Sequence, residues 1–165
     1  MTTISSDLPA NVQRVAEVLA AAGHAHAPRM LDGAARTAQQ AADSLGVLVG
    51  QIAKSIIFKR VSDEAAVLVV TAGDQRVDER KVATLVGDLA RADADFVRAK
   101  TGFAIGGVSP VAHMEQSVVL FDESLQRFDV VWAAAGHPHG VFPLAPQDLP
   151  KLCPEGQWAN VALEA

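Results

Sequence analysis

The sequence has one cysteine, few charged residues and no long apolar run, and each shortage excludes a class of protein. Because Cys153 is the single cysteine, no internal disulfide can form, which suits a reducing compartment. Its apolar runs, such as residues 65–70, are far shorter than the ~20 residues that a membrane-spanning helix needs. The start of the chain is polar and shows no basic-then-apolar leader. We therefore expect a soluble cytoplasmic protein with no membrane partner.

The charge balance limits how the chain can bind nucleic acid. Charged residues make up 20% of the sequence and the formal net charge is -5, which argues against a protein that coats nucleic acid by general electrostatics. A nucleic acid held through a local basic patch remains compatible with these values, and DNA is not an expected partner. The length of 165 residues is enough for one domain with a sizeable core and too short for two ordinary domains. Half of these residues are hydrophobic, as in a globular protein.

The hydrophobic pattern predicts a mixed α/β (α+β) single domain over residues 1–165. Thr37 and Gln40 form a capping box at a helix start, and Val82, Leu85 and Val86 form the expected inward face of a later helix. Residues 65–72 show no alternation, which is typical of a central strand covered on both faces. Helices are predicted at residues 9–22, 37–46, 78–87, 93–100 and 146–151, and strands at 28–31, 51–60, 65–72, 117–122, 130–135, 141–144 and 158–163.

One lysine interrupts an apolar face of the strand predicted at residues 51–60. Ile52, Lys54, Ile56 and Phe58 share a parity, so a pleated backbone directs all four to one face. A charged ammonium is costly to hold away from water. Either Lys54 lies near the strand start and reaches solvent, or it lies at the floor of a pocket and is directed at a ligand.

The glycine-rich loop Gly-Gly-Val-Ser-Pro at residues 106–110 has two interpretations. Adjacent glycines allow a ligand to approach backbone N–H groups closely, which is how an oxyanion is bound without side chains. The alternative is a tight structural turn. The loop is not a phosphate-binding loop of the P-loop type, because Gly-Lys-Ser/Thr is absent.

Two His-x-His pairs and a set of basic residues are further candidates. His24/His26 and His137/His139 could each point two imidazoles one way for a metal, but no acid-flanked histidine motif completes either pair, so no metal is expected. His137 lies either at a pocket rim or in a plain turn.

The residues that would meet phosphates, or else form a solvated face, are Arg76, Arg80, Lys81, Arg98 and Lys100.

Four segments in order carry a resemblance to a known family. They are residues 37–58, with Leu-Gly and then Ile-Ala-Lys-Ser-Ile-Ile-Phe; 71–77, Thr-Ala-Gly-Asp-Gln-Arg-Val; 101–110, Thr-Gly-Phe-Ala-Ile-Gly-Gly-Val-Ser-Pro; and 135–139, Ala-Gly-His-Pro-His. Together they resemble the YbaK/ProX family of aminoacyl-tRNA deacylases, which is similar to the editing domain inserted in bacterial prolyl-tRNA synthetases. The resemblance covers roughly residues 37–152 and implies a central mixed sheet or partial barrel flanked by helices. Ala112 departs from it, since many members have glycine there.

The resemblance implies hydrolysis of the ester in mischarged tRNA, without a cofactor. Lys54 matches the essential lysine, and Gly107 lies where backbone N–H groups would hold the oxyanion. His137 matches a position that judges the bound amino acid by size. The other expected substrate contacts are Gly106, Ser109, Pro110, Thr37 and Ser55. The expected substrate is a small amino acid (alanine, serine, threonine or cysteine) on tRNA for proline or a related tRNA, with an aminoacyl-tRNA synthetase as a possible partner. Alternatives are a binding module without catalysis and a metal-dependent hydrolase that uses the histidine pairs.

Overall fold

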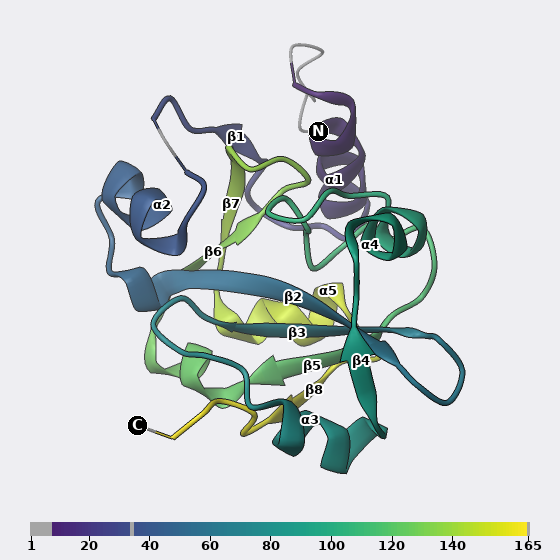
Figure 1. Cartoon of the computed structure of the whole chain (residues 1–165). Helices are drawn as coiled ribbons and strands as arrows, with labels where there is room; N and C mark the ends of the chain where they lie inside the picture. Colours follow the sequence, from purple (N-terminus) through teal and green to yellow (C-terminus); the bar gives the residue numbers. More distant parts are fainter. Residues whose placement is uncertain (1–7, 34, 165) are drawn as a thin grey trace.

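The computed structural model of the chain describes residues 8–33 and 35–164, so the expectation about the polar start concerns residues outside this part. Figure 1 shows a mixed sheet with helices around it, which confirms the predicted fold class. No helix of the described part is both long and apolar enough to cross a membrane. The α-helices are α1 (Ala10–Ala21), α2 (Ala38–Leu45), α3 (Glu79–Val86), α4 (Ala94–Thr101) and α5 (Leu149–Leu152), with short 3-10 turns η1 (Val49–Gln51), η2 (Glu123–Arg127) and η3 (Pro146–Asp148).

Within the described residues the strands form one sheet in the order β1-β7-β6-β2-β3-β5-β8, and β4 pairs with β2 beside this path. Pairing is antiparallel for β1–β7, β6–β7, β2–β3 and β2–β4, and parallel for β2–β6, β3–β5 and β5–β8. The strands are β1 (Arg29–Met30), β2 (Ile52–Arg60), β3 (Ala66–Ala72), β4 (Leu89–Arg91), β5 (Val118–Asp122), β6 (Val131–Ala134), β7 (Gly140–Leu144) and β8 (Gln157–Ala159).

The central strand β3 divides the core into two sides. All its residues are buried, as the absence of alternation predicts. Leu68 and Val70 belong to the large cluster that includes residues of α1, α4 and α5. Val67 and Val69 face the other way and pack with Val82 of α3. Successive strand residues alternate between faces, so both faces of β3 are covered.

Helix α2 covers the same face of the sheet as α3, but over different strands. Ala41 and Ala42 pack with Ile52 of β2 in a cluster separate from that of α3. Thr37 caps the helix through its Oγ1, which accepts from the N–H of Gln40 at 3.1 Å. The Gln40 side chain accepts from the Arg36 N–H at 3.0 Å, so the reciprocal half of the predicted capping box is shifted by one residue.

Three details of the sequence-based expectations are corrected. Of the three residues expected to face inward on α3, only Val82 is buried. Leu85 is 55% exposed. Strand β4 was not expected, since its three residues are too few to show a period. The expected last strand is shorter and continues only as an isolated bridge between Val77 and Ala162.

Candidate active site

Lys54 lies between two separate apolar clusters on one face of the sheet. Ile52 is buried under α2, and Phe58, at the other end of the same face, packs with the cluster of α3. The lysine is half-buried in the gap between these clusters, and its Nζ donates to the carbonyl oxygen of Gln75 at 2.8 Å. The shared parity predicted from the sequence is therefore present, and the face is not one continuous core.

The surroundings of Lys54 disfavour its charged form. Burial lowers the pKa of the Lys54 ammonium, and the nearby charge of Arg76 lowers it further, whereas Asp74 acts in the opposite direction. The Asp74 carboxylate is held by Arg127 through two hydrogen bonds of 2.7 and 3.1 Å. Because Arg127 neutralises this carboxylate, Lys54 has no carboxylate of its own among the described residues.

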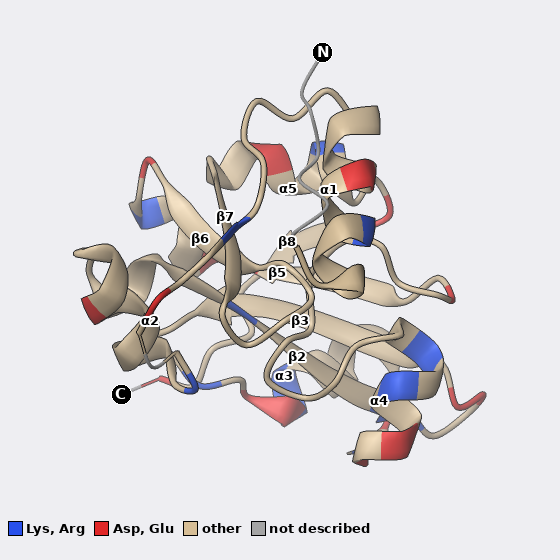
Figure 2. Ribbon diagram, turned by 90° about the horizontal axis from the view of Figure 1, so that it is seen from above, with Lys and Arg blue, Asp and Glu red and all other residues tan. Residues whose placement is uncertain are grey.

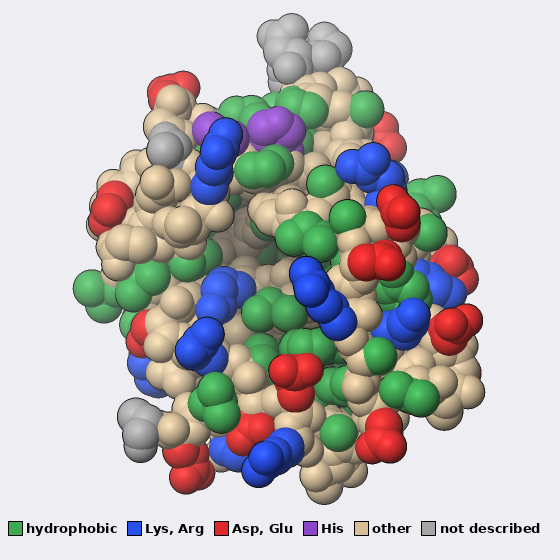
Figure 3. Space-filling model, viewed as in Figure 1, with side chains coloured by type: hydrophobic (Ala, Val, Ile, Leu, Met, Phe, Trp, Pro, Cys, Tyr) green, Lys and Arg blue, Asp and Glu red, His purple; other side chains and the backbone are tan. Residues whose placement is uncertain are grey.

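Lys54 lines a cavity of about 210 Å³ that opens on the face shown in Figure 3. The figure shows a hollow near the centre of this face, with basic side chains at its rim. The walls come from the start of α2, from β2, β6 and β7, and from the segment that follows α4. No aspartate or glutamate is among the lining residues, which are Ala35, Arg36, Thr37, Ala38, Ala41, Ile52, Ala53, Lys54, Ser55, Ile56, Gly106, Val108, Trp132, Ala133, Ala134, Pro138, Gly140 and Val141.

An open strand edge forms one wall of this cavity. On the edge away from β3, β2 pairs with β6 at Ile52 and Ala53 only, and with β4 from Phe58 onward. Residues 54–57 have no strand partner on that edge within the described part. In a strand alternate residues point their N–H and C=O to the same edge, so two of these four residues present both groups to the gap. The cavity therefore has backbone donors and acceptors beside Lys54.

The glycine loop supplies a second set of backbone donors, but not from the glycine that the sequence favours. Gly106, with φ of +93°, and Val108 both line the cavity. Neither amide donates a hydrogen bond to another described residue. The N–H of Gly107 instead donates to the carbonyl oxygen of Ala104 at 3.0 Å. In this structure the amides free to meet an oxyanion are thus those on either side of Gly107.

Gly107 has a packing role against the β6–β7 turn. A Cβ at this position would lie 3.1 Å from the Cα of His137, a tight contact that would require the turn to shift by a few tenths of an ångström, so glycine favours this close approach. His137 itself is half-buried, and its Nδ1 accepts from the N–H of His139 at 3.0 Å. Its neighbour Pro138 lines the cavity, whereas His137 does not. The structure thus places His137 beside the glycine loop at the edge of the site.

The last two residues of the loop face away from the cavity. Ser109 and Pro110 are buried, and neither is among the lining residues. The carbonyl oxygen of Ser109 accepts from Nε2 of His113 at 2.7 Å, and that of Pro110 accepts from Sγ of Cys153 at 3.2 Å. Burial lowers the pKa of His113 and raises that of Cys153 to about 12, so both side chains are neutral donors. His113 was not among the predicted residues, because its partner is visible only in the folded loop.

Thr37 and Ser55 do line the cavity, as expected of substrate contacts. The Oγ1 of Thr37 is already used as the cap of α2. The Oγ of Ser55 is buried and has no hydrogen-bond partner among the described residues, and the same holds for Oγ1 of Thr71, which lies opposite Lys54 in the β2–β3 register. Two hydroxyl groups without a protein partner thus lie beside the lysine position, whereas most buried polar groups in folded proteins are hydrogen-bonded.

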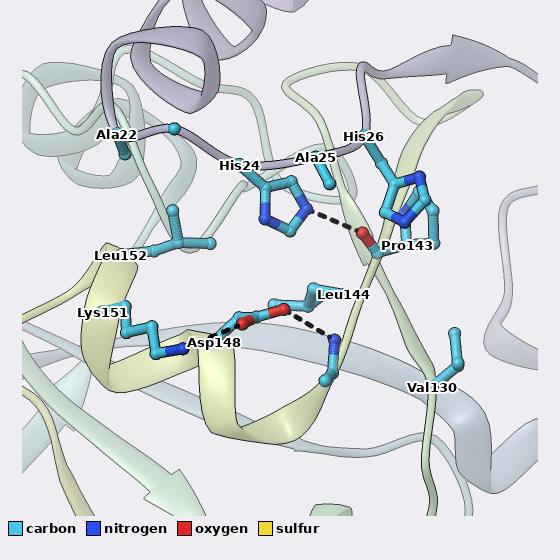
Figure 4. A pocket seen from close by; sticks show the side chains of 12 residues that line it. Ala22, His24, Ala25, His26, Val130, Pro143, Leu144, Asp148, Lys151 and Leu152 are labelled. Carbon is cyan, nitrogen blue, oxygen red and sulfur yellow. Dashed lines mark hydrogen bonds and ion pairs between the residues drawn. The ribbon is translucent and has the colours of Figure 1, made fainter.

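The other histidine pair lines a separate cavity of about 370 Å³, shown in Figure 4. Nε2 of His24 lies 2.9 Å from the carbonyl oxygen of Pro143, so this nitrogen carries the proton. Asp148 and Lys151 on the opposite wall are 3.8 Å apart and neutralise each other. No group of three or more His, Cys, Asp or Glu side chains in the described part is arranged to hold a metal. Although this cavity is larger than the one around Lys54, its lysine is ion-paired and the free loop amides of the first cavity are not part of it.

The five basic residues predicted to meet phosphates are dispersed. Lys81 donates to the carbonyl oxygen of Ala162 at 2.9 Å, and Lys100 lies 3.4 Å from Glu115. Arg80 on α3 and Arg98 on α4 are exposed and do not line the cavity. Figure 2 shows acidic as well as basic residues along α4. Arg76 alone of the five acts on Lys54 electrostatically.

Arg36 is a basic lining residue that sequence reasoning missed. It stands directly before the N-cap Thr37 and is exposed at the cavity. Its position directly before the predicted capping box could have marked it as a candidate. The local sequence pattern does not show, however, whether the residue before the helix faces the cavity or the solvent.

A cavity with a lysine that forms no ion pair, free backbone amides and no carboxylate is suited to bind and polarise a carbonyl or an anion. The family model for the aminoacyl-tRNA editing domain matches residues 32–152. The chain belongs to this family, and the resemblance to the YbaK/ProX deacylases is confirmed.

Individual relatives agree with this membership. The uncharacterized protein YwhH of Bacillus subtilis is 35% identical over 126 residues, 76% of this chain and 80% of that protein. The proline–tRNA ligase of Limosilactobacillus fermentum is 34% identical over 97 residues, which are 56% of this chain and 17% of the ligase. A crystal structure of a protein proposed as a trans-editing enzyme for prolyl tRNA synthetase has a TM-score of 0.89 at 36% identity, covering 96% of this chain and 100% of the other.

Proposed function

We propose that this protein is a trans-editing hydrolase that removes a wrongly attached small amino acid from tRNA. The substrate would be alanine, serine, threonine or cysteine esterified to tRNA for proline or a related tRNA. Membership of the aminoacyl-tRNA editing family supports the reaction, and the similarity to a prolyl-tRNA ligase and to a proposed trans-editing enzyme supports the choice of tRNA.

The observation that carries the proposal is the cavity around Lys54. Hydrolysis adds one water to the ester carbonyl carbon and gives a tetrahedral oxyanion. The oxyanion collapses by breaking the bond to the ribose oxygen, which takes a proton that the water supplied. The free amides of Gly106 and Val108 are the donors proposed for the oxyanion. Lys54 would position the ester and the terminal ribose by its charge rather than act as a base.

The small apolar walls support selection of a small amino acid. Ala38 and Ala41 of α2 and Ala133 of β6 line the cavity together with the side chain of Trp132. A missing methylene gives a synthetase only about 1–3 kcal/mol of discrimination, so a second pocket that admits small side chains would improve fidelity.

The test is a panel of mischarged tRNAs, with loss of the amino acid followed over time. We expect hydrolysis of at least one small amino acid on tRNA for proline, and no metal requirement, so activity should persist in a chelator. If no member of the panel is hydrolysed above the buffer rate while the protein still retains a synthetase or tRNA in a pull-down, the chain is a binding module and not an enzyme.

A further inference from the structure

The cavity around Lys54 has positive charge and no opposing acid. Lys54 and Arg36 both line it, and no carboxylate does. The carboxylate that acts on Lys54, Asp74, is held by Arg127. An excess of one sign at a partly enclosed surface favours a ligand group of the other sign, because low-dielectric walls strengthen the field.

The Arg36 guanidinium is placed to bind such a group. The backbone N–H of Arg36 is fixed by the side chain of Gln40 at 3.0 Å, directly before the helix start. The side chain is exposed and makes no hydrogen bond or ion pair with another described residue. A guanidinium on a fixed backbone, with its donors free, is suited to bidentate recognition of a phosphate.

A second guanidinium lies near the same wall. Arg29 of β1 stacks over the ring of Trp132 with 4.8 Å from Cζ to the ring centroid, and Trp132 lines the cavity. Arg29 also has no ion pair among the described residues. The basic character of this wall therefore does not depend on one side chain.

The chemistry of the proposed substrate leaves few anions to meet this charge. In an aminoacyl ester the carboxyl group of the amino acid is esterified and the α-amino group is neutral or positive. The anions closest to the reacting carbon are then phosphates, and the first is the phosphate that joins the terminal adenosine to the preceding cytidine.

We propose that Arg36 binds the phosphodiester between the last two nucleotides of the aminoacyl-tRNA while Lys54 engages the ester. This inference rests on the proposed function, and it names the part of the tRNA that the cavity itself reads. Binding of one phosphate by Arg36 would also let a chain of net charge -5 hold RNA, because this contact depends on the local charge at the cavity and not on the net charge.

The test measures binding rather than hydrolysis, so it is independent of the proposed activity. The probes are the dinucleotide cytidylyl-adenosine and the same dinucleotide with an uncharged methylphosphonate linkage. The proteins are the wild type, Arg36→Ala, Arg36→Lys and the control Arg98→Ala, in which an exposed arginine outside the cavity is removed.

We expect the wild type and Arg98→Ala to bind the charged dinucleotide roughly 10-fold or more tightly than the neutral one, the range for a charge-assisted hydrogen bond. Arg36→Ala should lose most of this difference, since Lys54 and Arg29 keep some positive charge at the cavity, and Arg36→Lys should recover part of it. Unchanged melting temperatures would show that the variants are folded.

Two results would overturn the inference: a wild type that does not distinguish the probes, or an Arg36→Ala variant that distinguishes them as strongly as the wild type. Either result leaves the hydrolysis proposal standing. Conversely, an inactive protein that distinguishes the probes through Arg36 would retain the phosphate site and lose the deacylase assignment.

Discussion

Lys54 Nζ and the carbonyl oxygen of Gln75 are joined by a hydrogen bond of 2.8 Å, which links strand β2 to the turn that follows β3. Lys54 also lies opposite Thr71 in the register of the two strands. The ammonium is thus fixed by a neutral acceptor instead of a carboxylate, and its charge remains available to a ligand in the cavity.

Replacing Lys54 should abolish editing. We expect Lys54→Ala to lower kcat/KM for a mischarged tRNA about 100-fold or more, because both the position and the charge at the ester are lost. Lys59→Ala is the matched control, since Lys59 lies on the same strand outside the cavity, where its Nζ is 4.0 Å from the exposed Glu64 and 5.5 Å from the centroid of the Phe96 ring. Equal activity of both variants would refute a role for Lys54 in the reaction.

The stability contributed by position 54 should depend on pH in a defined direction. Because the folded state lowers the pKa of Lys54 below 10.5, the unfolded chain binds more protons between the two pKa values, and the free energy of unfolding rises with pH there. The Lys54→Met variant has no titratable group at this position, so its free energy of unfolding lacks this pH dependence. Urea unfolding of both proteins from pH 7 to 10.5 should therefore show the wild type gaining stability relative to the variant. A relative loss over that range would contradict the lowered pKa.

Ala112→Gly should stabilise the fold. Ala112 has φ of +65°, a left-handed conformation that costs an L-residue about 1–2 kcal/mol. Glycine removes this strain but loses about 0.5–1 kcal/mol through its greater freedom in the unfolded chain. The difference between these two ranges is a net gain of between zero and about 1.5 kcal/mol in urea unfolding. Ala99→Gly, in the exposed interior of α4, is the control and should cost about 1 kcal/mol.

Asp122→Ala should destabilise strongly without touching the cavity. The Asp122 side chain is 1% exposed; its Oδ1 accepts from the N–H of Val161 at 2.8 Å, and Oδ2 accepts from the N–H of Ser124 at 3.1 Å. Removing the carboxylate leaves the buried Val161 N–H unpaired, at a cost of about 1–3 kcal/mol. The exposed Asp129→Ala is the control. A melting temperature that is unchanged in Asp122→Ala would show that another group replaces the carboxylate.

Much of the architecture could be predicted because it depends on local periodicity. The helix caps at Thr37 and Asp78, the fully buried strand β3 and the β6–β7 hairpin each involve residues close in sequence. Strand β4 and the exposure of Leu85 could not, because a three-residue strand has no period and a helix face is buried only where a neighbour covers it.

The sequence by itself determined most of the elements, the parity that puts Lys54 on an apolar face, and the family. Tertiary structure alone decided which groups meet in the cavity. The Ser109 and Pro110 carbonyl oxygens turn to His113 and Cys153, the latter 43 positions away from Pro110, while Gly106 and Val108 line the cavity and their amides stay unpaired. Arg36 likewise reaches the cavity only because α2 packs over β2. The orientation of a loop peptide depends on partners distant in the chain, and local patterns carry no information about them.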